Sequence, residues 1–267
     1  MSVLLQISDT HFGTERAPVV EALVAFAMQL CPDLVVLSGD ITQRARRAQF
    51  QAARAFVDRL PATVLAIPGN HDVPLFDVLS RLIRPYGRYR ETFGDDLEPV
   101  HASADLLVTC LNTTRWWRHK NGEISAAQIE RVAARIAGAA PGQLRVIVVH
   151  QPVAVPQAGE VHNLVARHAA AVRRWADAGA DLVLGGHIHL PCVMPLTDLP
   201  RPLWVVQAGT AVSHRVRGEQ PNSVNVLRWG QDAPLGHCVI ERWDCAAAGP
   251  AFSRAAVTAF EPLRMAR

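Results

Sequence analysis

The chain has 267 residues, and its 27 Lys plus Arg against 24 Asp plus Glu give a formal net charge of +3. A hydrophobic content of 49% with 19% charged residues is typical of a globular protein and argues against disorder. So small a charge excess argues against a surface that coats nucleic acid, although it leaves room for a local site that binds an anionic substrate.

The chain shows no signal for a membrane or for secretion. No apolar run approaches the roughly 18 residues that span a bilayer, and the N-terminus has no basic segment followed by a long apolar one. Five cysteines are scattered without a Cys-x-x-Cys pair, so we expect neither a disulfide framework nor a thiolate zinc site. We therefore expect a soluble, cytoplasmic protein with no membrane partner. With no internal repeat and no low-complexity linker, a single domain over residues 1–267 is preferred to two.

The first apolar run, residues 3–7, predicts a short strand that stops at Ser8-Asp9-Thr10-His11. In an extended segment residues i and i+2 point the same way, so Asp9 and His11 can reach one point. For this pair alone, a Ser/Asp-rich turn that caps a helix over residues 18–30 is the alternative.

Two further runs deliver polar residues in the same way. Residues 33–37 end in Ser38-Gly39-Asp40, and residues 63–67 end in Pro68-Gly69-Asn70-His71-Asp72, with a helix predicted over 45–60 between them. Open α/β sheets gather ligands at the carboxyl ends of their strands, although Gly-Asn also makes ordinary turns. Strand–helix units in succession favour a mainly parallel region.

The middle of the chain adds a strand over residues 105–111 and then Trp116 and Trp117. Adjacent tryptophans can stack on a planar group, but more often they fill a core or an interface. Ser125 followed by Gln128 predicts a capped helix that runs to about residue 139.

Two later strand ends carry histidines. Residues 144–149 end at His150, which alone would usually be a structural residue, and residues 181–184 end in Gly185-Gly186-His187-Ile188-His189. The glycines let the backbone turn sharply, and His-x-His in an extended segment points both rings to one side. A helix is predicted between these strands over residues 164–178. Alternating runs within about 190–244 predict antiparallel strands that complete a second sheet, and the tail from residue 245 carries no functional signal.

Five strand ends together supply three oxygen donors and four imidazoles, without a thiolate. They are Asp9, His11, Asp40, Asn70, His150, His187 and His189. This donor set suits Mn, Fe, Co, Ni or Zn. Seven ligands are too many for one ion, whereas two ions about 3.5–4 Å apart that share one carboxylate would use them all.

The order Asp-x-His, Gly-Asp, Gly-Asn-His-Asp, His, Gly-His-x-His resembles the calcineurin-like metallophosphoesterase superfamily from about Asp9 to His189. Within it, the chain is most similar to class III cyclic nucleotide phosphodiesterases. That similarity rests on the Asp9 motif, on Tyr89-Arg90 ahead of Phe93-Gly94, and on Asn112 with Gly122 before a helix. The resemblance implies a four-layer αββα sandwich of two mixed sheets flanked by helices.

The resemblance also implies roles for the site residues. One ion would be held by Asp9, His11, Asp40 and His189, and the second by Asn70, His150 and His187, with Asp40 bridging the two. His71 would not be a ligand but would contact the substrate or its leaving oxygen, and Asp72 would orient the His71 ring. Asp72 stands where many relatives have Glu.

The activity implied is that of a metal-dependent phosphoric diester hydrolase, with Mn or Fe expected first and Zn, Co or Ni as alternatives. A hydroxide between the ions would attack phosphorus in line, and His71 would assist the leaving oxygen. The leading substrate is a cyclic nucleotide, 2′,3′ or 3′,5′, and the alternative is a glycerophosphodiester or another small diester. A non-catalytic protein-binding scaffold of the same fold is the alternative of another class. A nuclease is disfavoured by the small net charge, and a homo-oligomer stays open.

Residues 113–119 and 151–163 are loops beside the predicted site. Because loops next to a rigid site usually carry specificity, we expect these two to flank the metals and to select the substrate.

Overall fold

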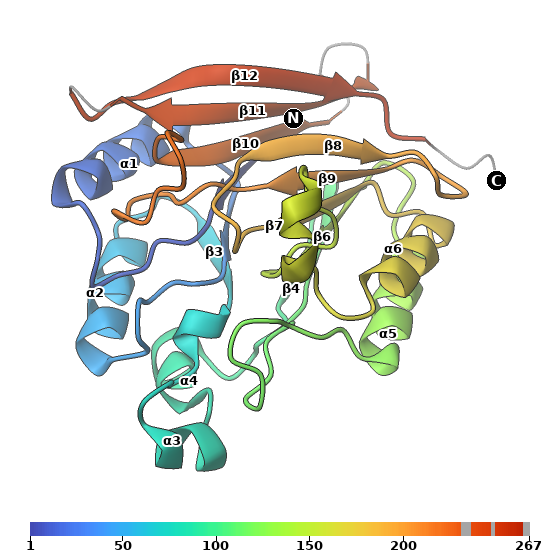
Figure 1. Ribbon diagram of the computed structural model, residues 1–267. Helices are drawn as coiled ribbons and strands as arrows, with labels where there is room; N and C mark the ends of the chain where they lie inside the picture. Colours follow the sequence, from blue (N-terminus) through green and yellow to red (C-terminus); the bar gives the residue numbers. More distant parts are fainter. Residues whose placement is uncertain (231–235, 247–248, 264–267) are drawn as a thin grey trace.

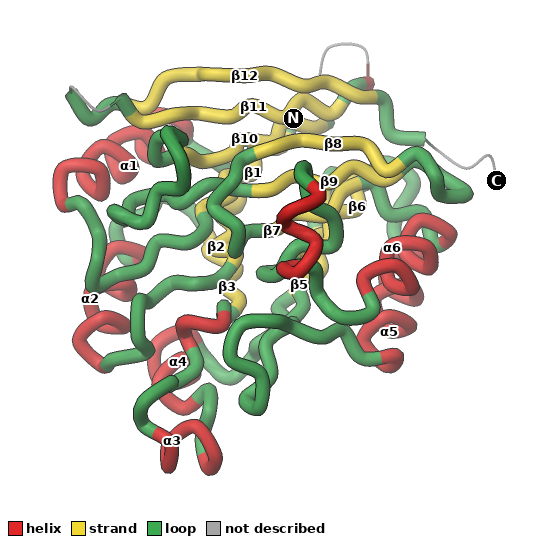
Figure 2. The backbone as a smooth tube through the Cα atoms, in the orientation of Figure 1, coloured by secondary structure: helices red, strands yellow, loops and turns green. Residues whose placement is uncertain are grey.

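The computed structural model of the chain describes residues 1–230, 236–246 and 249–263. Their strands form two sheets of six, packed face to face (Figures 1 and 2). The first sheet contains β1 (Ser2–Ile7), β2 (Leu34–Ser38), β3 (Thr63–Ile67), β10 (Ser223–Trp229), β11 (Cys238–Cys245) and β12 (Phe252–Phe260). The second contains β4 (Val100–Ala102), β5 (Leu106–Cys110), β6 (Leu144–Val148), β7 (Leu182–Gly185), β8 (Cys192–Leu196) and β9 (Leu203–Gln207).

Helices cover the outer face of each sheet (Figure 1). The first sheet packs against α1 (Ala17–Leu30) and α2 (Arg47–Val57), and the second against α5 (Ala126–Ala137) and α6 (His168–Asp177). Between the sheets lies an apolar layer that includes Leu4, Val36, Val146 and Leu184. The four-layer αββα sandwich predicted from the sequence is therefore confirmed. Two short helices, α3 (Val78–Ile83) and α4 (Gly87–Phe93), extend from one end of it.

Parallel pairing brings the strand ends together. In the first sheet β1 pairs in parallel with β2, and β2 with β3; in the second, β5, β6 and β7 pair in parallel in that order. Every residue of β2, β5, β6 and β7 is buried, as expected for strands covered on both faces. The carboxyl ends of neighbouring parallel strands lie on one edge of each sheet, which places their following turns side by side.

The predicted Ser125 cap is present, since Ser125 Oγ accepts from the Gln128 amide at 3.1 Å and Gln128 Oε1 accepts from the Ser125 amide at 2.9 Å.

No helix in the described part of the chain is long and apolar enough to cross a bilayer.

The last strands correct one prediction. The sequence predicts that residues from about 190 to 244 complete the second sheet, and β8 and β9 do so. However, β10 pairs antiparallel with β1 and carries β11 and β12 with it, so these three strands belong to the first sheet. Alternation shows which face of a strand is buried but not which strand lies beside it. The strand β12 lies in the tail from residue 245, where no strand was predicted, and most of its residues are exposed.

Candidate metal centre

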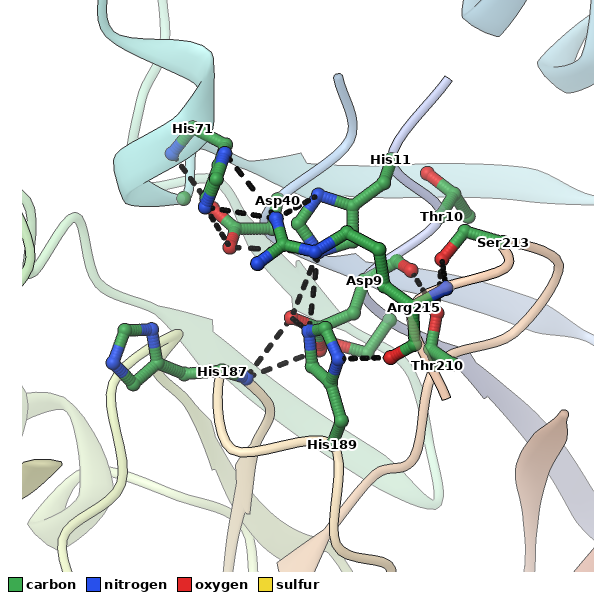
Figure 3. A network of polar contacts seen from close by, with 12 residues as sticks. Asp9, Thr10, His11, Asp40, His71, His187, His189, Thr210, Ser213 and Arg215 are labelled. Atoms are coloured by element: carbon green, nitrogen blue, oxygen red, sulfur yellow. Dashed lines mark hydrogen bonds and ion pairs between the residues drawn. The ribbon is translucent and has the colours of Figure 1, made fainter. Parts of the chain in front are cut away.

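Six of the seven predicted ligands gather at the carboxyl ends of β1, β2, β6 and β7. Their donor atoms form two groups, each within 4.8 Å: Asp9, His11 and His189 in one, and Asp40, His150 and His187 in the other. A third group of the same size joins Asp40 and His11 to His71, so His71 lies at the junction of the two (Figure 3). The seventh residue, Asn70, follows β3 and is buried.

Asp40 faces both groups. Its Oδ1 lies 3.2 Å from His150 Nε2, and its Oδ2 lies 3.8 Å from His11 Nε2. In the first group, His189 Nε2 lies 3.2 Å from Asp9 Oδ1 and 3.1 Å from His11 Nε2. One carboxylate thus stands between two histidine-rich pockets, which is the arrangement a bridging ligand needs.

Backbone carbonyls fix the tautomers of three histidines. The Nδ1 atom of His150 lies 3.0 Å from the Ser38 carbonyl oxygen, and the Nδ1 atom of His189 lies 2.6 Å from the Arg215 carbonyl oxygen. In His71 the partner is the Gln43 carbonyl at 2.9 Å. Because a carbonyl oxygen only accepts, each Nδ1 carries a proton, and when the ring loses its second proton the lone pair is left on Nε2. Metal-binding histidines commonly donate their second ring N–H in this way.

Three buried polar atoms of this cluster have no hydrogen-bond partner among the described residues: Asn70 Oδ1 and both ring nitrogens of His187. An unpaired buried polar atom costs about 1–3 kcal/mol, so native proteins rarely keep several in one place. Atoms with lone pairs that converge on a common space fit metal ions, which would satisfy them together.

The backbone is strained at the same place. Among the described residues eight that are not glycine have a positive φ, and five of these are predicted ligands: Asp9 (51°), His11 (44°), Asp40 (48°), His187 (74°) and His189 (55°). Each such residue costs on the order of 1–3 kcal/mol, and such strain clusters at functional sites. The left-handed turns also correct the expectation that Asp9-x-His11 and His187-x-His189 are extended. Asp9 and His11 still converge through this tight turn, with His11 Nε2 3.9 Å from Asp9 Oδ1. His187 and His189 do not point to one side as predicted, because His189 joins Asp9 and His11 while His187 joins Asp40 and His150.

Two glycines allow the turns to approach one another. A methyl group on Gly69 would overlap the amide and the carboxylate of Asp40, and one on Gly186 would overlap the side chains of Ser8 and Asp9. The glycines of the Gly-Asn and Gly-His motifs are therefore required by close contact with the carboxylates across the site.

The charges of the metal-free cluster favour cations. Burial acts to raise the pKa of Asp9, but the neighbouring His189 and His150 together outweigh burial and lower this pKa to about 2. Burial also opposes ionisation of Asp40, yet the charge of His150 holds the pKa of Asp40 well below its usual range. Conversely, burial lowers the pKa of His187 to about 3, so this ring is neutral. Burial acts to lower the pKa of His150 as well, but the Asp40 carboxylate raises it to about 9. Metal binding would therefore use the ionised carboxylates and the neutral His187 as they are, and would displace a proton from His150.

Asp72 does not orient the His71 ring, so that prediction is wrong. Its carboxylate accepts instead from the backbone amides of Gly69 (2.8 Å), Ile41 (3.0 Å) and Thr42 (2.7 Å). The side chain turns toward the Ile41 and Thr42 amides in the loop after β2 and the Gly69 amide after β3, which outcompete a ring already held by the Gln43 carbonyl. Burial raises the pKa of Asp72 to about 7. Asp72 thus ties together the two turns that carry Asp40 and Asn70.

The two predicted specificity loops meet each other. Thr113 donates to the Gln151 side chain, and the pKa of His119 is lowered by burial, with charges that include His71 contributing. The indoles of Trp116 and Trp117 pack edge to face with centroids 5.5 Å apart, and they are 38% and 57% exposed. They do not belong to the apolar core, which leaves them accessible to a ligand.

Sequence reasoning missed Arg215, whose Nη1 lies 3.0 Å from His71 Nε2. It lies between β9 and β10, in a segment with no ligand spacing and no periodic pattern that could have indicated it. The only sequence signal is an Arg-x-Arg pair, Arg215 and Arg217, after a polar turn.

The sandwich and the carboxylate–histidine cluster at its strand ends are features of a metal-dependent phosphoesterase. The model of the family described as calcineurin-like phosphoesterase matches residues 2–191, and the chain belongs to this family. Over 215 residues the chain is 25% identical to the cAMP/cGMP dual specificity phosphodiesterase MT0825 of Mycobacterium tuberculosis, an alignment that covers 74% of this chain and 65% of the relative.

A shorter alignment, with 37% identity over 83 residues, joins the chain to the glycerophosphodiester phosphodiesterase GpdQ of Enterobacter lignolyticus, and it covers 26% of this chain and 29% of the relative. The chain thus spans less than two thirds of either relative's length. A crystal structure of a dimetal phosphatase from Danio rerio superimposes with a TM-score of 0.71 over 98% of this chain and 99% of that one. At 15% identity this likeness concerns the fold alone.

Proposed function

We propose that the chain is a phosphodiesterase that uses two metal ions to hydrolyse a cyclic nucleotide. The observation that carries the proposal is the position of Asp40, whose two carboxylate oxygens face His150 and His11 in separate groups. One ion would be held by Asp9, His11, Asp40 and His189. The second would be held by Asp40, Asn70, His150 and His187.

The donor set fits such ions, because oxygen and imidazole donors converge with their lone pairs unpaired. We expect Mn or Fe, with Zn, Co or Ni as alternatives. Two bound ions would supply Lewis acidity and an activated water nucleophile, and they would offset charge on the phosphoryl oxygens. The chain's own residues would hold the ester in line with the attacking water and assist the departure of the leaving oxygen.

His71 would serve the leaving oxygen. Its Nε2 lies 4.0 Å from Asp40 Oδ2 and faces the space between the two groups, while its Nδ1 is held by the Gln43 carbonyl. To donate a proton, the ring must carry one on Nε2 in addition to the one on Nδ1. Asp72 would support this step only indirectly, by fixing the turn from which the His71 ring projects.

The cyclic nucleotide preference is supported by the longest of the alignments above, to a protein described as a cAMP/cGMP phosphodiesterase. Trp116 and Trp117 are exposed on the loop that carries His119, and they offer aromatic faces on which a nucleobase can stack. A glycerophosphodiester is the second candidate substrate, because the short alignment to GpdQ has the higher identity, 37%.

The test is a substrate panel on manganese-loaded protein, with 2′,3′-cAMP, 3′,5′-cAMP, glycerophosphocholine, bis(p-nitrophenyl) phosphate and p-nitrophenyl phosphate. We expect the highest kcat/KM for a cyclic nucleotide and much slower turnover of the monoester. A higher kcat/KM for glycerophosphocholine would replace the substrate but keep the reaction. Metal-loaded protein that hydrolyses none of these esters would contradict the proposal and favour a binding scaffold.

A further inference from the structure

Arg215 places a guanidinium in the candidate site. Its Nη1 lies 3.0 Å from His71 Nε2, 3.4 Å from His11 Nδ1 and 3.1 Å from Gln43 Oε1. Among the described residues no carboxylate forms an ion pair with Arg215. The neighbouring Arg217 shows the contrast, because its guanidinium forms two hydrogen bonds to Glu160, at 2.7 and 2.6 Å.

The backbone of Arg215 belongs to the network that orients the metal-site residues (Figure 3). Its carbonyl accepts from His189 Nδ1 at 2.6 Å, and its amide donates to Ser213 Oγ at 3.1 Å. The Ser213 hydroxyl lies 2.8 Å from Thr210 Oγ1, which donates to the Asp9 carbonyl at 2.6 Å. The position of Arg215 is therefore fixed by the same contacts that fix Asp9 and His189.

A second anchor lies two residues further on. Glu160, which is 6% exposed, accepts from Asn163 at 2.7 Å and from the Arg217 guanidinium, and Arg217 also reaches the Ile188 carbonyl at 3.3 Å. Contacts on both sides thus hold the segment in place. A cationic donor on a rigid segment is preorganised, since it loses little entropy when an anion arrives.

We propose that Arg215 binds a non-bridging oxygen of the phosphoryl group that is under attack. The proposal rests on the phosphodiesterase function above and names the residue that recognises the phosphoryl group. A guanidinium presents a planar fork of donors that matches phosphate oxygens, and its charge is unpaired until such an anion arrives. Arg215 keeps all its protons throughout, so it stabilises charge without taking part in proton transfer.

This role has a signature that separates Arg215 from the adjacent His71. A contact to a non-bridging oxygen is made whatever the leaving group, so its loss lowers turnover of alkyl and aryl esters alike. A proton donor to the leaving oxygen matters mainly when that oxygen is a strong base. Two side chains 3.0 Å apart are thus distinguished by leaving-group dependence.

The experiment compares Arg215→Gln and Arg215→Lys with Arg173→Gln, which removes the same charge from an exposed position on α6. Three quantities are measured for each manganese-loaded protein. They are the metal content, kcat/KM for a ribose cyclic diester and for bis(p-nitrophenyl) phosphate, and the affinity for inorganic phosphate by calorimetry. For Arg215→Gln we expect intact metals, a loss of about 10²–10³-fold on both esters, and phosphate binding weakened by about tenfold or more. Arg215→Lys should recover part of each loss because it keeps the charge without the fork, and Arg173→Gln should match the wild type.

Wild-type kcat/KM and phosphate affinity in Arg215→Gln would overturn the proposal. Metal loss in both Arg215 variants would show that the residue only supports His189. A loss of kcat/KM confined to the alkyl diester would show that Arg215 acts through His71. Either result overturns the proposal. If the wild type hydrolyses no ester, the proposed function fails, while the phosphate titration still decides whether Arg215 binds the anion. If Arg215→Gln does not fold, the comparison of Arg215→Lys with the wild type carries the test, and equal phosphate affinities would refute it.

Discussion

Oδ1 of Asp40 lies 3.2 Å from Nε2 of His150. The same carboxylate faces His11 in the other group, with Oδ2 3.8 Å from His11 Nε2. Its removal therefore takes a ligand from both pockets at once. We expect Asp40→Ala to lose both ions and, with them, phosphodiesterase activity, whereas Asp58→Ala, a change at an exposed carboxylate on the outer surface, should keep both. Metal analysis after dialysis decides this, and an Asp40→Ala protein that retains one ion as tightly as the wild type would refute the shared carboxylate.

His71 is predicted to assist the leaving oxygen without holding a metal. His71→Ala should keep its metals yet lose about 10²–10⁴-fold on an alkyl diester, with a much smaller loss on an aryl ester that departs without a proton. The informative quantity is the ratio of kcat/KM for a ribose cyclic diester and for bis(p-nitrophenyl) phosphate, in wild type and variant. An equal loss on both esters would assign His71 to phosphate positioning, and loss of metal would make it a ligand.

Trp116 is predicted to contact the nucleobase. Since its indole is 38% exposed, truncation should not open a cavity in the core. We expect Trp116→Ala to change the preference among cyclic nucleotides with different bases while leaving turnover of a base-free ester within about twofold of wild type, because stacking on a base is worth about 1–3 kcal/mol. The base-free ester is the internal control. Equal effects on all substrates, or none on any, would place Trp116 outside the substrate site.

Gly186 is predicted to be intolerant of a side chain, since a Cβ there would overlap Ser8 Oγ and Asp9 Oδ2. Gly186→Ala should lower the free energy of unfolding by about 1–3 kcal/mol and weaken metal binding by displacing Asp9. The matched control is Gly142→Ala, where a Cβ would meet nothing within 4 Å. Denaturant unfolding and metal titration measure the two effects. Equal behaviour of the two variants would show that the turn after β7 adapts freely.

The sequence was sufficient for the fold class and for bringing the candidate ligands together, because both depend on local patterns. Apolar runs that stop at Asp9, Asp40 and His150 predict strands, and parallel strands deliver their following residues to one edge. The sequence was insufficient for the pairing of strands that are distant in the chain. The pairing of β10 with β1, for example, joins opposite ends of the chain and leaves no local signal.

The contacts of two single residues in the site, Asp72 and Arg215, were also not predictable from the sequence. The partner of Asp72 is decided by three backbone amides that only the folded loops bring within reach. Arg215 lies 144 positions from His71 and 204 from His11 in the chain, within a segment that has no repeating pattern. Such contacts are consequences of tertiary packing, so composition and spacing do not predict them.

Anomalous diffraction at the manganese edge, from crystals of the manganese-loaded protein, tests most directly whether Asp40 joins two groups of metal ligands. We expect two peaks about 3.5–4 Å apart, one against Asp9, His11 and His189 and the other against His150 and His187, with Asp40 between them. A single peak, or two peaks that do not share Asp40, would contradict this expectation.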